Sequence, residues 1–196
     1  MLNFEPFDTK NIPLIVDQVF PMWSDFDGPL AYRRHYTEYI VRNNLFENDL
    51  CFQLTDSESG DFLANAFFMH VPDSCLAKEW LAAVKNQYTD EEVAAFEKCA
   101  KYIEDMDARV QAYMKNDDIQ MTLYVSRKKG AGSAILEKAL EILRERGYKN
   151  LYLWTDCECS WEWYTNHGYE LVERGVCDQF SHGDQEYSTF IFRRKI

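Results

Sequence analysis

Apolar and polar positions recur along the chain with two periods, which predict a mixture of strands and helices. The stretches that favour strands are 2–7, 50–55, 62–71, 119–125, 151–155, 169–173 and 188–194. Helices are predicted over 9–19, 30–42, 133–146 and 160–166, and a loop punctuated by Gly and Pro over 21–29. Such a mixture predicts an α/β (α+β) fold.

Three segments define the organisation of the chain. The strands on either side of the polar turn 56–60 predict an antiparallel hairpin. Residues 119–155 predict a strand, a helix that stops at Gly147, and a second strand. Between these units, residues 72–118 are charged and have helical spacing. We expect a single domain over 1–196 with a helical insertion at about 72–118.

Composition narrows the classes of function. The chain has 196 residues, 46% of them hydrophobic, which suits one domain with a real core. A net charge of -12 repels phosphates, so we expect no nucleic-acid or membrane partner. The chain opens with no signal peptide and has no apolar run that could span a bilayer, so a cytoplasmic location is expected.

The segment Arg-Lys-Lys-Gly-Ala-Gly at 127–132 lies between a predicted strand and a predicted helix. N–H groups converge at such a junction, and the helix dipole favours an anion. Gly130 and Gly132 lack a Cβ, so the chain can bend tightly and its amides can approach phosphate oxygens. Three cationic side chains add positive charge. The segment therefore predicts a phosphate-binding site.

Two common nucleotide motifs do not fit this segment. No Gly-Lys-Ser/Thr ends it, as a Walker A loop requires, and Ile135 stands where a dinucleotide fingerprint needs a third glycine. A basic surface turn is the alternative, because short motifs give false matches. The helix that follows has an apolar face that can pack on a sheet.

The segment resembles motif A of the GNAT acetyltransferases, whose Arg/Gln-x-x-Gly-x-Gly/Ala pattern is matched by Arg127, Gly130 and Gly132. The link from Val125 to Arg127 is shorter than is usual in that family. The resemblance implies a mostly antiparallel mixed sheet flanked by helices, with acetyl-CoA as the acyl donor. The residues implied in binding it are Leu123, Tyr124, Val125, Arg127, Lys128, Lys129, Gly130, Ala131, Gly132, Ser133 and Ser160.

Residues 159–169 resemble motif B of the same family, with the aromatic pair Trp163-Tyr164 on a short helix and the step Gly168-Tyr169 after it. Amide formation from a thioester requires a proton for the departing thiolate. The resemblance implies Tyr164 as this general acid, and a core aromatic is the alternative. Ser160 stands at the predicted helix start, where its hydroxyl can cap N–H groups.

A general base is not evident, because the predicted strand 119–125 contains no Glu, Asp or His. Glu104, Asp117 and Asp118 are the candidates. The alternatives are a relay through water and, for these three residues, a solvated charged surface.

The acceptor is expected to be a cationic amine. The resemblance implies that the first loop forms one wall of the acceptor cleft, with Trp23, Phe26, Tyr32 and Tyr36 in or after it. The acidic segment 73–118 is expected to form another wall. Aromatic rings and carboxylates both attract cations.

The expected function is acetyl-CoA-dependent N-acetyltransfer, with direct transfer of acetyl to a primary amine of a cationic small molecule. A protein amino group as acceptor and a non-catalytic acyl-CoA-binding module are the alternatives. Because members of the family are often dimers, a homodimer is also considered.

Soft metal ligands gather near the end of the chain, namely Cys157, Cys159, His167, Cys177 and His182. Their Cys-x-Cys spacing differs from the usual Cys-x-x-Cys, and they fall on different predicted elements. We therefore expect no metal and reduced cysteines.

Overall fold

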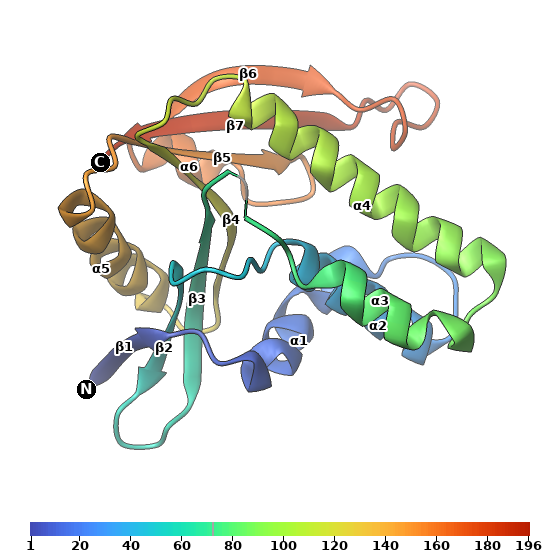
Figure 1. Cartoon of the computed structure of the whole chain (residues 1–196). Helices are drawn as coiled ribbons and strands as arrows, with labels where there is room; N and C mark the ends of the chain where they lie inside the picture. Colours follow the sequence, from blue (N-terminus) through green and yellow to red (C-terminus); the bar gives the residue numbers. More distant parts are fainter. Residues whose placement is uncertain (72) are drawn as a thin grey trace.

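The computed structural model describes residues 1–71 and 73–196 and contains a seven-stranded sheet in the order β1-β2-β3-β4-β5-β7-β6 (Figure 1). The strands are β1 (Leu2–Pro6), β2 (Cys51–Asp56), β3 (Phe62–Met69), β4 (Asp118–Ser126), β5 (Asn150–Asp156), β6 (Glu170–Val176) and β7 (Ser188–Lys195). The helices are η1 (Thr9–Asn11), α1 (Ile12–Trp23), α2 (Leu30–Asn43), α3 (Ala77–Val84), η2 (Lys85–Gln87), α4 (Asp90–Gln111), α5 (Ala131–Glu145) and α6 (Glu162–Asn166). The predicted α/β fold with a mostly antiparallel sheet is confirmed.

The parallel pair β4–β5 divides the sheet into two halves. These strands pair only over residues 118–120 and 150–152. β4 continues along β3 as far as Ser126, and β5 continues along β7 as far as Asp156. In Figure 1 the directions of β3 and β5 are nearly crossed. We call the space between the separated parts of β4 and β5 the fork.

A β-bulge in β4 increases the separation. Met121 and Leu123 pair with consecutive residues of β3, so Thr122 is the extra residue. Its hydroxyl donates to the carbonyl oxygen of Asn44 at 2.7 Å, which ties the bulge to the end of α2. Bulges bend a strand and increase its twist, so the bulge helps to turn β4 away from β5.

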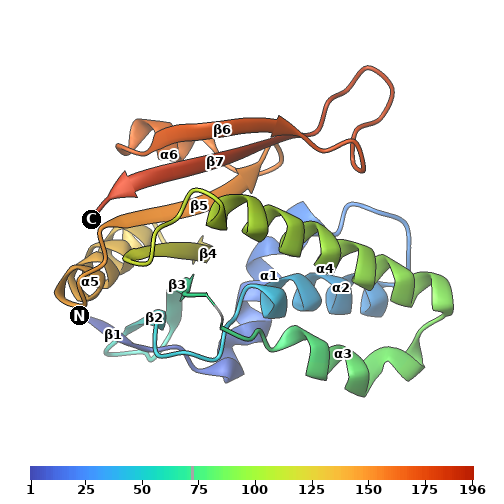
Figure 2. The same cartoon turned by 45° about the horizontal axis from the view of Figure 1, so that its top comes forward.

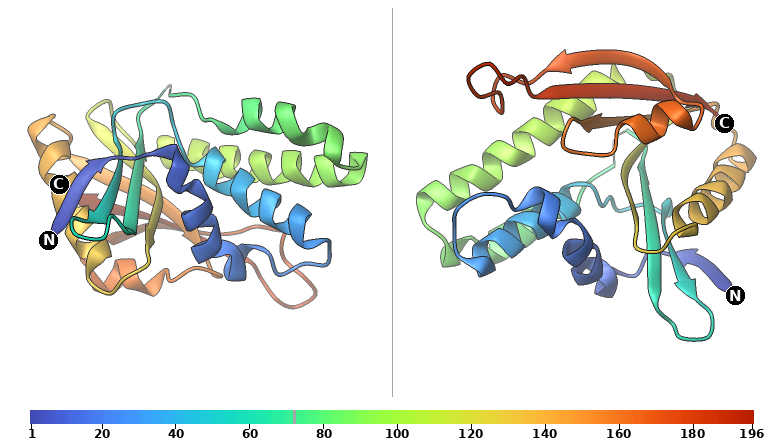
Figure 3. Two further views of the ribbon diagram at one scale, coloured as in Figure 1. Left: turned by 90° about the horizontal axis from the view of Figure 1, so that it is seen from below. Right: turned by 180° about the vertical axis from the view of Figure 1, so that it is seen from behind.

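The helices cover both faces of the sheet (Figures 1 and 3). On one side, which we call the α5 face, α5 buries Ile135 and Leu143 against the strands. On the other side, the α4 face, α1 packs on β3 and β4, and α4 packs on Tyr152 and Ile191. The fork therefore opens between two helical layers.

Helices α2, α3 and α4 form a layer of their own (Figure 2). Phe96 of α4 is fully buried, with four tyrosine rings between 5.2 and 5.7 Å from it. Thr89 and Glu92 form a capping box that starts α4. The helical character predicted for 72–118 is confirmed in α3 and α4; Pro72 lies outside the described residues, and the single domain stays a prediction.

Several predicted boundaries were wrong. The loop predicted from Pro21 begins after Trp23, because Pro21 lies inside α1. Because Pro21 has no N–H, the carbonyl oxygen of Asp17, four residues earlier, lacks its helical hydrogen bond. Asp17 is exposed, so water can donate to this oxygen instead. α5 begins at Ala131 rather than at Ser133. None of the helices in the described part of the chain combines the length and apolar character that a membrane crossing needs.

We predict that Phe96→Ala lowers the free energy of unfolding by about 3–5 kcal/mol, because it empties the centre of the α2–α3–α4 layer. Urea unfolding followed by circular dichroism measures the change. The exposed Met22→Ala variant is the control and should stay within about 0.5 kcal/mol of the wild type. A Phe96→Ala protein as stable as the control would show that the layer does not depend on this ring.

Candidate functional site

A short basic loop joins β4 to α5 at the fork. The N–H of Arg127 donates to the carbonyl oxygen of Leu63 at 2.8 Å, and the hydroxyl of Ser126 donates to that of Lys128 at 3.0 Å. Gly130 caps α5 with a positive φ of 86°. The side chains of residues 127–129 are exposed. The described backbone hydrogen bonds include no acceptor for the N–H groups at 132 and 133, so the first turn of α5 presents free donors to an anion.

Gly132 is required by packing and not by its backbone conformation, because it lies inside α5 without a positive φ. A Cβ at this position would lie 2.5 Å from the hydroxyl oxygen of Tyr124 and 3.2 Å from Cβ of Ser126. Tyr124 comes from the separated part of β4 and is half-buried on the α5 face. The glycine therefore lets β4 approach the head of α5 closely, a constraint that the motif alone does not reveal.

A groove of about 180 Å³ lies between α5 and α6 and begins at Ser133 in the first turn of α5. Its remaining lining is Leu136, Glu137, Leu140, Trp163, His167 and Arg194. Trp163 stacks on His167 with ring centroids 3.9 Å apart. The same indole lies 5.7 Å from the ring of Tyr124. The two sequence motifs are thus joined into one surface.

Tyr164 follows Trp163 and packs inward from it. Its ring lies 5.2 Å from Tyr169 and 5.5 Å from Phe192. Burial raises the pKa of the Tyr164 phenol, so the group holds its proton at neutral pH. A protonated phenol at this position is chemically able to act as an acid.

Ser160 does not cap α6 as predicted. The helix begins at Glu162, and its cap residue, Trp161, makes no side-chain capping bond. Ser160 instead contributes its carbonyl oxygen, which accepts from the N–H of Trp163 at 3.1 Å. Its side chain is exposed. An extra turn before the helix therefore moves the hydroxyl away from the capping position.

The separated part of β4 has different partners on its two faces. Leu123 and Val125 are buried among the α1 residues on the α4 face, whereas Tyr124 points to the α5 face. The edge of β4 toward β5 has no strand partner from 121 to 126. Backbone polar groups on that edge are available to a ligand lying in the fork.

Asp107 is a buried carboxyl at the fork that the sequence analysis missed. It lies on α4 and is 8% exposed. One oxygen, Oδ1, accepts from Nε2 of Gln120 at 2.6 Å and from Nε1 of Trp154 at 2.7 Å. Burial raises the pKa of Asp107 to about 6, although both hydrogen bonds lower it. Its spacing from the apolar residues Ile103 and Val110 could have identified it, because the three share one helix face.

Two of the three predicted base candidates have partners of their own. Asp118 is buried where β4 and β5 are still paired, and it accepts from Asn150 at 2.6 Å and from the N–H of Lys115 at 2.9 Å. Glu104 is exposed and pairs with Lys78 at 3.3 Å. Asp117 is exposed as well. The hydrogen bonds of Asp118 hold the closed end of the fork.

Aromatic and acidic side chains gather beyond Asp107 on the α4 face. Trp154 and Asp156 share this face, because alternate residues of a strand do. Burial, followed by the charges of Asp156 and Asp25, raises the pKa of Glu158. Tyr102 packs edge-on against Trp154 at 5.4 Å.

The predicted aromatic wall was wrong for Tyr32, whose ring is buried in the α2–α3–α4 layer beside Phe96. Phe26 and Tyr36 are half-buried and pack against the same cluster, and their place in a wall stays a prediction. Trp23, at the end of α1, packs instead against the α1 core. On the α4 face, Trp154 of β5 and Tyr102 of α4 are aromatic residues near the fork.

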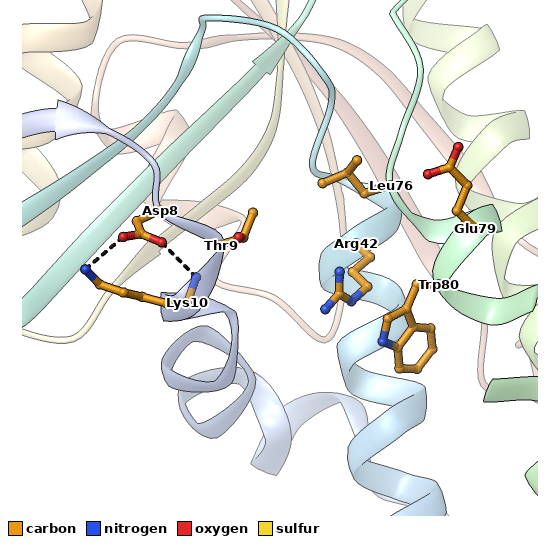
Figure 4. Close-up of a pocket in the computed structure, with 7 residues that line it drawn as sticks. All are labelled: Asp8, Thr9, Lys10, Arg42, Leu76, Glu79 and Trp80. Atoms are coloured by element: carbon orange, nitrogen blue, oxygen red, sulfur yellow. Dashed lines mark hydrogen bonds and ion pairs between the residues drawn. The ribbon is translucent and has the colours of Figure 1, made fainter. Parts of the chain in front are cut away.

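A wider hollow of about 570 Å³ lies elsewhere, between the start of α1, α2 and α3 (Figure 4). Lys10 contacts Asp8 at 2.8 Å and Arg42 contacts Glu38 at 2.7 Å, whereas the described ion pairs include none for Glu79. None of the predicted site residues lines it. Within the described part of the chain, no group of three His, Cys, Asp or Glu side chains is placed to hold a metal ion.

Comparison with solved structures identifies the fold as that of the GNAT N-acetyltransferases. The ribosomal-protein-S18-alanine N-acetyltransferase from Escherichia coli aligns with a TM-score of 0.56 at 16% identity, over 100% of this chain and 94% of that one. Arylalkylamine N-acetyltransferase 2 from Aedes aegypti gives 0.56 at 13%, over 100% and 99%. The polyamine N-acetyltransferase of Drosophila melanogaster gives 0.53 at 12%, over 100% of each chain. No family model matches the sequence, and no curated protein matches it.

We predict that Gly132→Ala lowers the free energy of unfolding by about 1–3 kcal/mol, because the new methyl group collides with the Tyr124 hydroxyl. Adding Tyr124→Phe removes the closest atom and should restore most of the lost free energy of unfolding. Urea unfolding of the two single variants and the double variant measures this coupling. Equal effects of Gly132→Ala with and without the hydroxyl would contradict the contact.

Proposed function

We propose that the chain is an acetyl-CoA-dependent N-acetyltransferase that transfers acetyl directly to a primary amine of a cationic small molecule. The observation that carries this proposal is the fork, with the basic loop at its α5 end and the α5–α6 groove beside it. The unpaired edge of β4, the free donors of α5 and the groove together can hold an extended, anionic thioester.

The residues of the loop fit a pyrophosphate. The free amides of 132 and 133, the other amides of the loop 128–131 and the side chains of Arg127, Lys128 and Lys129 would hold it, because helix N–H groups and cations both favour phosphate. The groove lined by Ser133 and Trp163 would take the pantetheine arm, and the exposed hydroxyl of Ser160 is assigned to the same arm.

Residues on each side of the fork would divide the chemistry. When bound, acetyl-CoA supplies a thioester whose carbon accepts the amine nitrogen as the C–S bond breaks. N–H groups of successive residues alternate between the two edges of a strand. Those of the segment Leu123, Tyr124 and Val125 that point to the unpaired edge would stabilise the negative charge on the carbonyl oxygen. Tyr164, which is protonated at neutral pH, would donate its proton to the departing sulfur.

The α4 face supports a cationic acceptor. Burial, followed by the charges of Asp156 and Asp25, raises the pKa of Glu158, so both aspartates repel its carboxylate. The structure includes no ion pair for them among the described residues. An ammonium group placed there would relieve this repulsion, and the ring of Trp154 offers a further surface for a cation. The amine would then approach the fork from the face opposite to the basic loop.

We predict that the triple variant Arg127→Ala, Lys128→Ala, Lys129→Ala weakens acetyl-CoA binding at least about tenfold, because each lost charge-assisted hydrogen bond costs about 1.5–3 kcal/mol. Isothermal titration calorimetry measures the affinity. The control replaces Lys78, Lys85 and Lys115, three exposed lysines outside the loop, with Ala, so the net charge changes equally. No binding to the wild type would overturn the proposed function.

Tyr164→Phe is expected to lower kcat by a factor of about 10²–10⁴ while leaving acetyl-CoA affinity unchanged. The substitution removes the hydroxyl group that carries the proton and keeps the packing of the ring. Thiol release with a panel of amines and polyamines measures kcat, and calorimetry measures affinity. Wild-type binding without thiol release from any amine would favour the non-catalytic acyl-CoA-binding module. Full turnover by Tyr164→Phe would assign the proton to another group.

A further inference from the structure

We propose that Asp107 is the general base that removes the proton from the acceptor amine; this inference rests on the proposed acetyltransferase function. The step forms a bond between the amine proton and Oδ2 of Asp107, directly or through one water. The amine nitrogen keeps the electron pair that forms the C–N bond, and the proton then passes to solvent.

The hydrogen bonds of Asp107 fix its position at the fork. Gln120, one donor to Asp107, is the last residue of β4 that pairs with β5. Trp154, the other donor, lies two residues beyond the last paired residue of β5. One carboxylate thus bridges the two strands where they separate. A base for the amine has to lie near this point, because the reacting carbonyl would lie between the same strands.

Asp107 also lies on the appropriate face. Gln120 and Trp154 point to the α4 face, whereas Tyr124 and the groove belong to the α5 face. The proposed acid, Tyr164, is on the α5 side. A base and an acid on opposite faces can act on the attacking nitrogen and on the leaving sulfur without exchanging a proton directly.

The polar atoms at the site are not all used within the protein. Both hydrogen bonds reach Oδ1 of Asp107, so neither uses Oδ2. Oε1 of Gln120 is fully buried and has no partner among the described residues. A buried carbonyl oxygen without a hydrogen-bond donor costs the folded state about 1–3 kcal/mol. An amine N–H or a water is such a donor, so the unpartnered atom marks the place where the acceptor would arrive.

The surroundings of Asp107 suit proton transfer near neutral pH. On its own helix, Glu104 is the charged group that raises its pKa, and Tyr102 is a neutral phenol nearby. Arg109 turns away to Glu173 of β6. Gln120 of β4, Trp154 and Tyr152 of β5, and Ile191 of β7 carry no charge at this pH. With its pKa near 6, Asp107 is ionised at pH 7–8 and can accept a proton.

A purely structural role for Asp107, as a link between α4 and the two strands, predicts a different result. Asp107→Asn keeps an oxygen that can accept from Gln120 and Trp154, so the link is retained while the base is lost. If the role is catalytic, kcat/KM at pH 7.5 falls by about 10²–10⁴ and the acidic limb of its pH profile near pH 6 disappears. Acetyl-CoA affinity and the urea midpoint stay at wild-type values.

Two more variants move the acidic limb in opposite directions. Trp154→Phe removes a hydrogen bond that lowers the pKa of Asp107, so the limb moves to higher pH. Glu104→Gln removes a charge that raises this pKa, so the limb moves to lower pH. A structural link would give no such pair of shifts.

The experiment is the pH dependence of kcat/KM for the wild type and the three variants, with the best amine of the panel. If Asp107→Asn turns over as fast as the wild type and keeps the acidic limb of the pH profile, the assignment of the base is overturned, but the proposed function is not. If Asp107→Asn fails to fold, the other two variants test the assignment. An acidic limb that stays at the wild-type pH in both Trp154→Phe and Glu104→Gln overturns the assignment of Asp107 as the base. Wild-type protein that binds acetyl-CoA but acetylates no amine overturns the proposed function, and the base with it.

Discussion

The early end of the β4–β5 ladder is the constraint on which the site depends. Beyond the point where they separate, β4 is held by β3 and β5 by β7 on the outer edge, which keeps the two strands apart. The bulge at Thr122 and the hydroxyl bond to Asn44 hold β4 in its bend. Unpaired backbone groups inside a protein are costly unless something satisfies them. An open fork between two packed layers is therefore a stable place for a ligand with amide groups of its own.

The helices on the two faces keep the fork open in different ways. On one face, Gly132 lets the head of α5 meet Tyr124 of β4, which joins the basic loop to the strand. On the other face, Asp107 of α4 is bonded to β4 and β5 together. The capping box and the ring cluster around Phe96 fix α4 in turn. Stability of the helical layer and geometry of the fork are thus coupled through one carboxylate.

The sequence predicts the parts of this structure that depend on local rules. The hairpin β2–β3, the β4–α5–β5 unit and the stop at Gly147, whose φ is 90°, follow from period and from glycine chemistry. The rule that proline ends a helix failed at Pro21, because the helix tolerates the loss of one N–H donor where water can replace it. Local rules failed again for Tyr32, because the same aromatic residue suits a cleft wall and a helix–helix core.

Asp107 shows a different limit. A carboxylate among apolar residues of a helix face was visible in the sequence, but its partners Gln120 and Trp154 lie on two other elements and are 13 and 47 residues away. Only the packing of α4 across the fork brings the three together. The carboxylates near Trp154 and the cations of the basic loop are separated in the same way, one set on the α4 face and the other at the α5 end. In a chain of net charge -12, this separation would give the proposed anionic donor and cationic acceptor opposite routes to one point, so that neither would have to cross the field that repels it.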